Sequence, residues 1–130
     1  MQDRFKFRIW NGTEMHYNDF VVTATGFVGK ITEEFLGRCV FNQEDLTADK
    51  ECILMQCTGM KDKTGTLIYE GDIVTDVLTN KFIINFNKNY LSYLLTNIKT
   101  KESMVFYPNI QLEVIGNIYE NKDLLNEKET

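Results

Sequence analysis

Residues 53–74 read Ile53-Leu-Met-Gln-Cys-Thr-Gly-Met-Lys-Asp-Lys-Thr-Gly-Thr-Leu-Ile-Tyr-Glu-Gly-Asp-Ile-Val74 and predict two short strands around a turn. The apolar run Ile53 to Thr58 is long enough for a buried strand and too short for a helix. Residues 59–65 predict the turn, because Gly59 and Gly65 can adopt positive φ and Asp62 favours turns. The region therefore begins as a compact β structure.

The second half of this region turns sharply before it becomes extended again. Gly71 lets the backbone turn, and Asp72 can accept hydrogen bonds from nearby amides. Glu70 and Asp72 could serve acid–base chemistry or hold a cation, but carboxylates at the start of a strand more often satisfy turn amides. The β-branched pair Ile73-Val74 then begins a strand, an order typical of small β-barrels.

Three sequence blocks lie in order along the chain: Leu54-Met-Gln-Cys-Thr-Gly-Met-Lys-Asp-Lys-Thr-Gly65, Ile68-Tyr-Glu-Gly-Asp-Ile-Val74 and Glu113-Val-Ile-Gly-Asn-Ile-Tyr-Glu-Asn121. With the opening Phe5-Lys-Phe-Arg-Ile-Trp10, they resemble the YopX family of phage and prophage proteins over nearly the whole chain. The resemblance implies an SH3-like barrel with an additional N-terminal β region. It implies no active site, because the family's biochemical function is not established. Cys57 stands where the family more often has Tyr or Phe, a departure that concerns packing alone.

Composition fits one domain, or one small barrel with an extension. The 130 residues are 43% hydrophobic and include nine Phe and six Tyr, which suit β structure. The chain has no apolar run of membrane-spanning length, and it opens Met-Gln-Asp-Arg without the apolar core of a signal peptide. We therefore expect a cytoplasmic protein of the bacterial host that does not act at a membrane.

The N-terminal region, residues 1–51, predicts a β-hairpin extension. Residues 5–10 alternate in polarity as a half-buried strand does, and Asn11-Gly12 predicts a two-residue turn before a return strand in 13–17. Residues 28–41 are compatible with one helical turn or with an irregular loop. The polar, acidic residues 42–51 predict a loop or short helix at the boundary with the barrel.

The barrel, residues 52–121, predicts further antiparallel strands, and an acidic tail follows in 122–130. A single 3₁₀ turn is expected after Pro108, which breaks the strand ladder. Gly116 marks a place where another backbone could approach closely, and a helical turn is expected at 123–126. The strands are expected at 73–78, 81–87, 90–96, 103–107 and 113–118.

No catalytic or metal signature is present, so we expect no enzyme activity, no metal and no cofactor. Cys39, Cys52 and Cys57 lack CxxC spacing, which favours reduced and mostly buried thiols. His16 is the only histidine, and no nucleophile motif lies near it in the sequence. An enzyme centred on His16, Glu70 and Asp72 is therefore the least favoured interpretation.

Charge distribution keeps a second function open. The net charge of −5 disfavours the whole surface as a nucleic-acid platform. Residues 77–101, however, contain four lysines and no acidic residue, interleaved with aromatic residues. Most of these aromatic residues occupy alternating strand positions, which favours core packing, and lysines commonly protect sheet edges. The residues that could contact nucleic acid or another partner are Lys81, Lys88, Tyr90, Tyr93, Lys99 and Lys101.

The sequence as a whole predicts a phage- or prophage-encoded accessory protein that acts by binding and does not catalyse a reaction. Its barrel or N-terminal extension would bind a protein partner or a second copy of the chain. The alternative is an accessory factor that binds nucleic acid through the lysines and tyrosines of residues 81–101.

Overall fold

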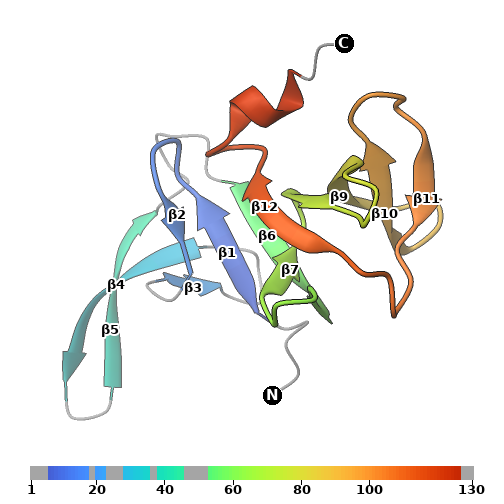
Figure 1. The fold of residues 1–130 in the computed structure, drawn as a ribbon. Helices are drawn as coiled ribbons and strands as arrows, with labels where there is room; N and C mark the ends of the chain where they lie inside the picture. The colour runs from blue at the N-terminus through green and yellow to red at the C-terminus, as the bar shows by residue number, and fades with distance from the viewer. Residues whose placement is uncertain (1–5, 18–19, 23–27, 36–37, 46–52, 127–130) are drawn as a thin grey trace. The chain divides into compact units, whose positions relative to one another are not determined.

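The computed structural model describes residues 6–17, 20–22, 28–35, 38–45 and 53–126, with the backbone alone for those between 20 and 45. These residues form a mainly β protein, as the sequence predicts (Figure 1). Two compact units make up the chain: Met1–Phe7 with Met55–Thr130, and Arg8–Leu54. The elements are β1 (Phe7–Trp10), β2 (Met15–His16), β3 (Phe20–Val22), β4 (Val28–Phe35), β5 (Arg38–Asp45), β6 (Ile53–Lys61), β7 (Leu67–Tyr69), β8 (Asp72–Thr75), β9 (Lys81–Asn87), β10 (Ser92–Asn97), β11 (Ser103–Val105), β12 (Glu113–Asn117) and the 3₁₀ helix η2 (Lys122–Leu125).

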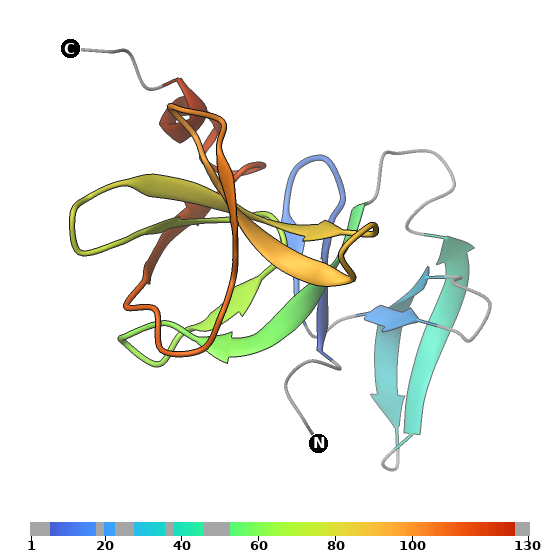
Figure 2. The same ribbon diagram turned by 90° about the vertical axis from the view of Figure 1, so that its right-hand side faces the viewer.

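Strands β6 to β12, called the barrel from here on, include a five-stranded antiparallel sheet with the order β11-β10-β9-β8-β12. Hairpins connect β8, β9, β10 and β11, and β12 returns to pair with β8. Strands β6 and β7 form a further hairpin. The sheet curls strongly (Figure 2). Backbone hydrogen bonds from the flanking turns hold the sheet and that hairpin together: Gly71, which follows β7, donates to the Ile84 carbonyl at 2.8 Å, and Lys63, between β6 and β7, donates to the carbonyl of Leu112 before β12 at 2.9 Å.

The core of the barrel forms where apolar side chains from different strands meet on the inner face of the curled sheet. Strand pairing places Ile84 opposite Leu95, and both side chains are almost completely buried. Burial of each such side chain stabilises the fold by about 1.5–3 kcal/mol. The buried cluster consists of Ile68, Val74, Phe82, Ile84, Leu95 and Leu112, against which Tyr93, Phe106, Ile110 and Val114 pack.

The smaller unit contains the β1–β2 hairpin and an antiparallel sheet with the order β3-β4-β5. The predicted two-residue turn at Asn11-Gly12 is wrong, because the connection is a four-residue loop, residues 11–14. The Asn11 side chain accepts hydrogen bonds from the amides of Thr13 at 2.9 Å and Glu14 at 2.8 Å. These bonds stabilise the longer loop, and the return strand shortens to Met15–His16.

The interpretation of residues 28–41 as a helical turn or a loop is also wrong. These residues lie largely in β4 and β5, and β5 continues to Asp45, into the region predicted as a boundary loop. The pairing of β4 with β5 shifts register between Gly29 and Lys30 and again between Ile31 and Glu33. Such bulges break the two-residue alternation that identifies a strand in sequence. Residues 46–51 lie outside the described part of the chain.

Several predictions for the barrel need correction. Strand β6 continues to Lys61, into the predicted turn 59–65, and β11 ends at Val105 instead of residue 107. Strand β8 ends at Thr75 instead of residue 78, because the Asp76 side chain binds the amides of the following turn. Strand β10 begins at Ser92 instead of residue 90, because the Asn87 side chain accepts a hydrogen bond from Asn89 and lengthens the turn. Within the described residues, an ordinary turn at Pro108-Asn109 takes the place of the expected 3₁₀ turn. The helical turn expected at 123–126 is present one residue earlier, as the 3₁₀ helix η2.

Candidate functional site

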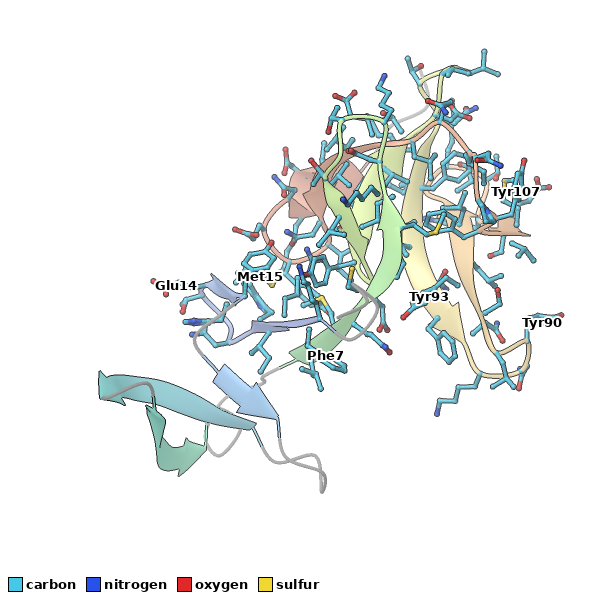
Figure 3. The ribbon with its side chains drawn as sticks, turned by 90° about the horizontal axis from the view of Figure 1, so that it is seen from below. Phe7, Glu14, Met15, Tyr90, Tyr93 and Tyr107 are labelled. Atoms are coloured by element: carbon cyan, nitrogen blue, oxygen red, sulfur yellow. The ribbon has the colours of Figure 1, made fainter. Side chains whose placement is uncertain are left out.

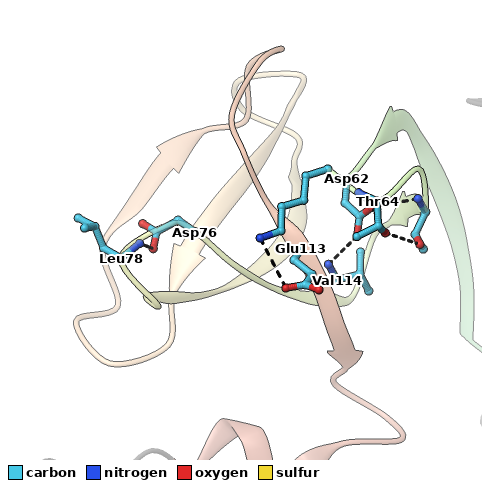
Figure 4. A network of polar contacts seen from close by, with 8 residues as sticks. Asp62, Thr64, Asp76, Leu78, Glu113 and Val114 are labelled. Atoms are coloured by element: carbon cyan, nitrogen blue, oxygen red, sulfur yellow. Dashed lines mark hydrogen bonds and ion pairs between the residues drawn. The ribbon is translucent and has the colours of Figure 1, made fainter.

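The turn between β6 and β7 is organised by the carboxylate of Asp62, whose residue is only 7% exposed (Figure 4). Its Oδ1 accepts hydrogen bonds from the Thr64 amide at 2.8 Å, the Thr64 hydroxyl at 2.7 Å and the Thr66 amide at 2.9 Å. Its Oδ2 accepts from the Val114 amide in β12 at 2.9 Å, which ties the turn to a strand 52 residues away. Burial tends to raise the pKa of Asp62, but these hydrogen bonds outweigh it and hold the pKa below its ordinary value of 3.8.

The turn between β7 and β8 connects several strands through its backbone. Glu70 donates to the Gln56 carbonyl at 3.0 Å, and the Gly71 carbonyl accepts from Ile118 at 3.0 Å. Gly71 has φ 89°, which disfavours any residue with a side chain. The almost fully buried Asp72 accepts a hydrogen bond from the Tyr69 amide at 2.8 Å. Asp72 thus serves a turn amide, as the structural interpretation of the sequence predicts.

The region around Gly116 is a third tightly bonded turn. A Cβ atom at Gly116 would lie 2.5 Å from Oδ1 of Asn121, so the neighbour at this glycine is a side chain, where the sequence indicated a backbone. Oδ1 of Asn121 accepts a hydrogen bond from the Asn117 amide at 3.1 Å. Oδ1 of Asn117 in turn accepts from the amides of Tyr119 and Glu120. The candidate motif glycines Gly59 and Gly65 have φ of 83° and 92°; Gly65 lies in the first turn, and Gly59 lies in β6 where the pairing with β7 shifts register. Hence all three sequence blocks stabilise turns of the fold.

The four lysines of residues 77–101 do not lie together. Lys88 follows β9, whereas Lys81 begins it, and a strand of this length separates their backbones by roughly 20 Å. Lys99 and Lys101 lie in the β10–β11 turn at the Lys81 end, where Ile98 donates a hydrogen bond to the Lys81 carbonyl at 3.0 Å. The lysines therefore form a group of three at one end of the hairpin and a single residue at the other.

The two candidate tyrosines have different environments. Tyr90 is 71% exposed in the β9–β10 turn, at the periphery in Figure 3. Tyr93 is half-buried against the core and makes an edge-to-face contact with Phe86, with a ring-centroid distance of 5.3 Å. Burial, reinforced by the charge of Glu70, raises the pKa of Tyr93 above its ordinary value of 10.0. Of these two tyrosines, Tyr90 is thus the one available as an open stacking platform.

Exposed apolar residues are frequent in the β8–β11 part of the barrel. Ten large hydrophobic side chains are exposed among the residues whose side chains are described, and eight of them fall between residues 77 and 107. They occur at both ends of the β9–β10 hairpin, with Val77 near the Lys81 end and Leu91 near the Lys88 end, and along β11. Contiguous exposed apolar groups mark binding surfaces more often than scattered residues do. The eight, called the apolar surface from here on, are Val77, Leu78, Phe86, Tyr90, Leu91, Met104, Val105 and Tyr107.

Two hollows open in this part of the barrel. The first, of about 250 Å³, is lined by Phe86, Leu91, Tyr93, Phe106 and Pro108 together with Thr58 and Met60 of β6. The second, of about 370 Å³, has a floor of buried Phe82, Leu95 and Leu112. Its rim includes Val77, Met104 and Tyr107 of the apolar surface. Because residues 104–108 contribute to both hollows, this segment forms their shared rim.

The residues of this rim were not identified from sequence. The run Met104-Val-Phe-Tyr-Pro108 was interpreted as a short strand and its break. Five consecutive apolar residues exceed what one buried face of a strand requires, because alternate side chains point to opposite faces. That excess is the signal that could have revealed an exposed apolar surface here.

The remaining candidate residues do not form a recognisable reaction centre in the described chain. His16 is paired with the Asn11 side chain at 2.9 Å. The thiol of Cys57 is fully buried and lies 3.6 Å from the Ile68 carbonyl. Across the described residues, no three His, Cys, Asp or Glu side chains come together as a metal site would require. Cys39 has only its backbone described, and Cys52 lies outside the described residues.

Comparisons with known proteins agree on one family and one fold. The family model described as YopX protein matches residues 6–126. The crystal structure of protein yopX from Bacillus subtilis is 20% identical, with a TM-score of 0.58, over 93% of this chain and 98% of that one. Protein EF1440 from Enterococcus faecalis is 23% identical, with a TM-score of 0.62, over 93% and 97%. No curated protein sequence matches the chain significantly. No helix in the described ranges has the length and apolar character needed to cross a membrane.

Proposed function

Since the chain belongs to the YopX family, we propose that it is a phage- or prophage-encoded accessory protein whose barrel binds a partner protein through the apolar surface. The observation that carries this proposal is the concentration of exposed apolar residues around the two hollows. Five members of the apolar surface line a hollow: Phe86 and Leu91 the first, and Val77, Met104 and Tyr107 the second.

The form of this surface favours a protein over a small molecule. The second hollow is near the lower limit of typical ligand pockets, and the first is smaller than that limit. Their rims are widely exposed, with Leu91 at 80% and Tyr107 at 54%, so a small ligand would leave much apolar area in water. A protein segment that inserts side chains into both hollows would cover the rim as well. Aromatic and methionine side chains are also the types enriched in protein interfaces.

The experiment compares substitutions of two tyrosines that have similar exposure but lie in different units of the chain. Tyr107 on the apolar surface is 54% exposed, and Tyr17 in the smaller unit is 46% exposed. Tyr107→Glu and Tyr17→Glu proteins would be used to capture proteins from the bacterial host, with the captured proteins quantified by mass spectrometry. We expect a protein that the wild type and Tyr17→Glu retain and that Tyr107→Glu loses. Equal capture by all three would contradict the proposal.

A second candidate function, nucleic-acid binding, is supported by the group of Lys81, Lys99 and Lys101 at one end of the β9–β10 hairpin. Asp76 and Glu102 are at the same end, however, so the local excess is a single positive charge. Fluorescence anisotropy with labelled single- and double-stranded oligonucleotides, at roughly 50 and 200 mM salt, tests it.

The protein-binding proposal expects no oligonucleotide binding at the lower salt concentration. Micromolar binding that weakens steeply with salt, and that falls when Lys88 and Lys99 are changed to Glu, would give nucleic acid first place instead.

A further inference from the structure

The outer edge of β11 is the next feature of the same surface. Strand β11 ends the five-stranded sheet, and among the described residues only β10 pairs with it. Phe106 donates to the Tyr93 carbonyl at 2.9 Å, and Asn97 donates to the Glu102 carbonyl at 2.8 Å. Because alternate residues of a strand direct their backbone groups to opposite sides, the amides and carbonyls of Ser103 and Val105 point away from β10. They form an edge that can accept another strand.

This edge carries no side chain within the strand that would prevent strand addition. Proteins block such edges by keeping the strand very short or by placing lysine, proline or bulges within it. With three residues, β11 has the first of these protections and none of the others. Ser103, Met104 and Val105 are all exposed and include no lysine or proline, and the pairing of β10 with β11 is regular. Lys101 and Pro108 stand outside the strand on either side, so they limit the accessible edge to residues 103–107.

The second hollow lies on one face of this edge. In an added strand, the residue opposite Met104 would share its face, with Cβ atoms about 5 Å apart. Met104 is 42% exposed on the rim of the hollow, above buried Leu95, its partner in β10. An apolar side chain from the added strand could thus reach the hollow, while its neighbours on either side point to the opposite face. Strand addition of this kind takes affinity from backbone bonds and specificity from pockets for alternate side chains.

Charge selects the occupant. The turn before β11 carries two exposed lysines, Lys99 and Lys101, and one adjacent acidic residue, Glu102, so its net charge is positive. An acidic residue at the end of the partner segment that lies beside Lys101 would therefore strengthen binding. A second copy of this chain does not supply one: in an antiparallel pair of β11 strands related about Met104, Lys101 would face Tyr107. Charge therefore favours a different protein over self-pairing.

We propose that β11 binds an extended segment of a partner protein as an added strand, with apolar side chains at alternate positions and an acidic residue beside Lys101. This inference rests on the proposed function, because it specifies how the same surface would bind. The probe is a displayed library of random linear peptides of about ten residues, selected on the full chain. We expect enriched peptides to alternate apolar and other residues and to carry Asp or Glu at one end.

Two substitutions at one position test the mode of binding. Val105→Pro removes an amide that points away from β10, and so leaves the bonds within the sheet in place. Val105→Thr keeps that amide and is the matched control. We expect Val105→Pro to weaken an enriched peptide about tenfold, the effect of one or two lost backbone hydrogen bonds, and Val105→Thr to weaken it less than about threefold. Chemical denaturation of each variant verifies that it is folded.

A charge exchange tests the predicted acid independently of any proline effect. Lys101→Glu should weaken an acidic peptide several-fold, and replacement of the peptide's acid by Lys should restore binding. Equal binding by wild type and Val105→Pro, or a library with no enriched peptide, would overturn the inference. The inference would also be overturned if the free protein is a dimer and Val105→Pro makes it monomeric, because the edge would then bind a second copy of the chain. If host-protein capture still depends on Tyr107 in these cases, the proposed function stands and only strand addition fails.

Discussion

Replacement of Asp62 should show how much the β6–β7 turn contributes to the barrel. Its carboxylate accepts four hydrogen bonds, and one of them joins the turn to Val114 of β12. A hydrogen bond to a charged group contributes about 1.5–3 kcal/mol to the free energy of unfolding, and a donor that is left unpaired away from water costs about 1–3 kcal/mol. The groups of Thr64 and Thr66 are exposed and can turn to water, so the Val114 bond dominates the loss. We expect Asp62→Ala to lower the free energy of unfolding by about 3–4 kcal/mol.

Asp76 offers a matched control in the same barrel (Figure 4). Its carboxylate also accepts hydrogen bonds from the next turn, namely the amides of Leu78 at 3.0 Å and Asn80 at 2.9 Å. These bonds are exposed and local, so Asp76→Ala should cost about 0.5–1 kcal/mol. Urea denaturation of the wild type and both variants measures the difference. A loss for Asp62→Ala no larger than that for Asp76→Ala would refute the role of the Val114 bond.

The pH dependence of the Asp62 effect has a definite sign. The folded-state pKa of Asp62 lies below its ordinary value of 3.8, so the folded chain favours the ionised carboxylate. The stabilisation is therefore fully present above pH 3.8 and is lost as the pH falls through the lower, folded-state pKa. The difference in unfolding free energy between wild type and Asp62→Ala should be constant from about pH 5 to about pH 8 and should shrink below 3.8. A difference that stays constant in acid would contradict this account.

Further predictions concern the other turns and the half-buried Tyr93. Gly116→Ala should destabilise the barrel by about 1–3 kcal/mol, because its Cβ would meet Oδ1 of Asn121 at 2.5 Å, and Asn121→Ala should reduce that cost in a double-mutant cycle. Gly71→Ala should cost at least about 1 kcal/mol in urea denaturation, because φ is 89°; an unchanged midpoint would show that the backbone adjusts. Because the pKa of Tyr93 is raised, the stabilisation by its neutral hydroxyl is present below pH 10.0 and is lost as the pH rises through the folded-state pKa. Tyr93→Phe should therefore unfold less readily than the wild type in alkali. An unchanged alkaline unfolding transition would contradict the raised pKa.

The barrel was largely predictable from sequence because its strands alternate regularly between turns with clear signals. Strand β9, Lys81–Asn87, has the bounds that the alternation predicts. The ends of β8 and β10 were misplaced because side chains of Asp76 and Asn87 bind turn amides, and sequence pattern alone does not indicate which local hydrogen bonds form. The β4–β5 hairpin was missed because its two register shifts remove the alternation that a search for strands depends on.

The candidate surface was predictable only in part. Lysines and tyrosines in residues 81–101 were expected to mark a partner surface, but strand register separates Lys88 from the other three lysines, and Tyr93 packs inward. Register depends on pairing between strands that no single segment specifies. The hollows form between residues 104–112 and side chains of other strands, and such a cavity depends on tertiary packing that composition does not report.

Site-specific photo-cross-linking in the bacterial host tests the central claim most directly. A benzophenone amino acid would replace Tyr107 in one protein and Tyr17 in another, two positions of similar exposure. Binding through the apolar surface predicts a discrete cross-linked protein at position 107 and none at position 17. A discrete adduct at position 17 alone, or no adduct at either position, would contradict the claim that the barrel binds its partner through this surface.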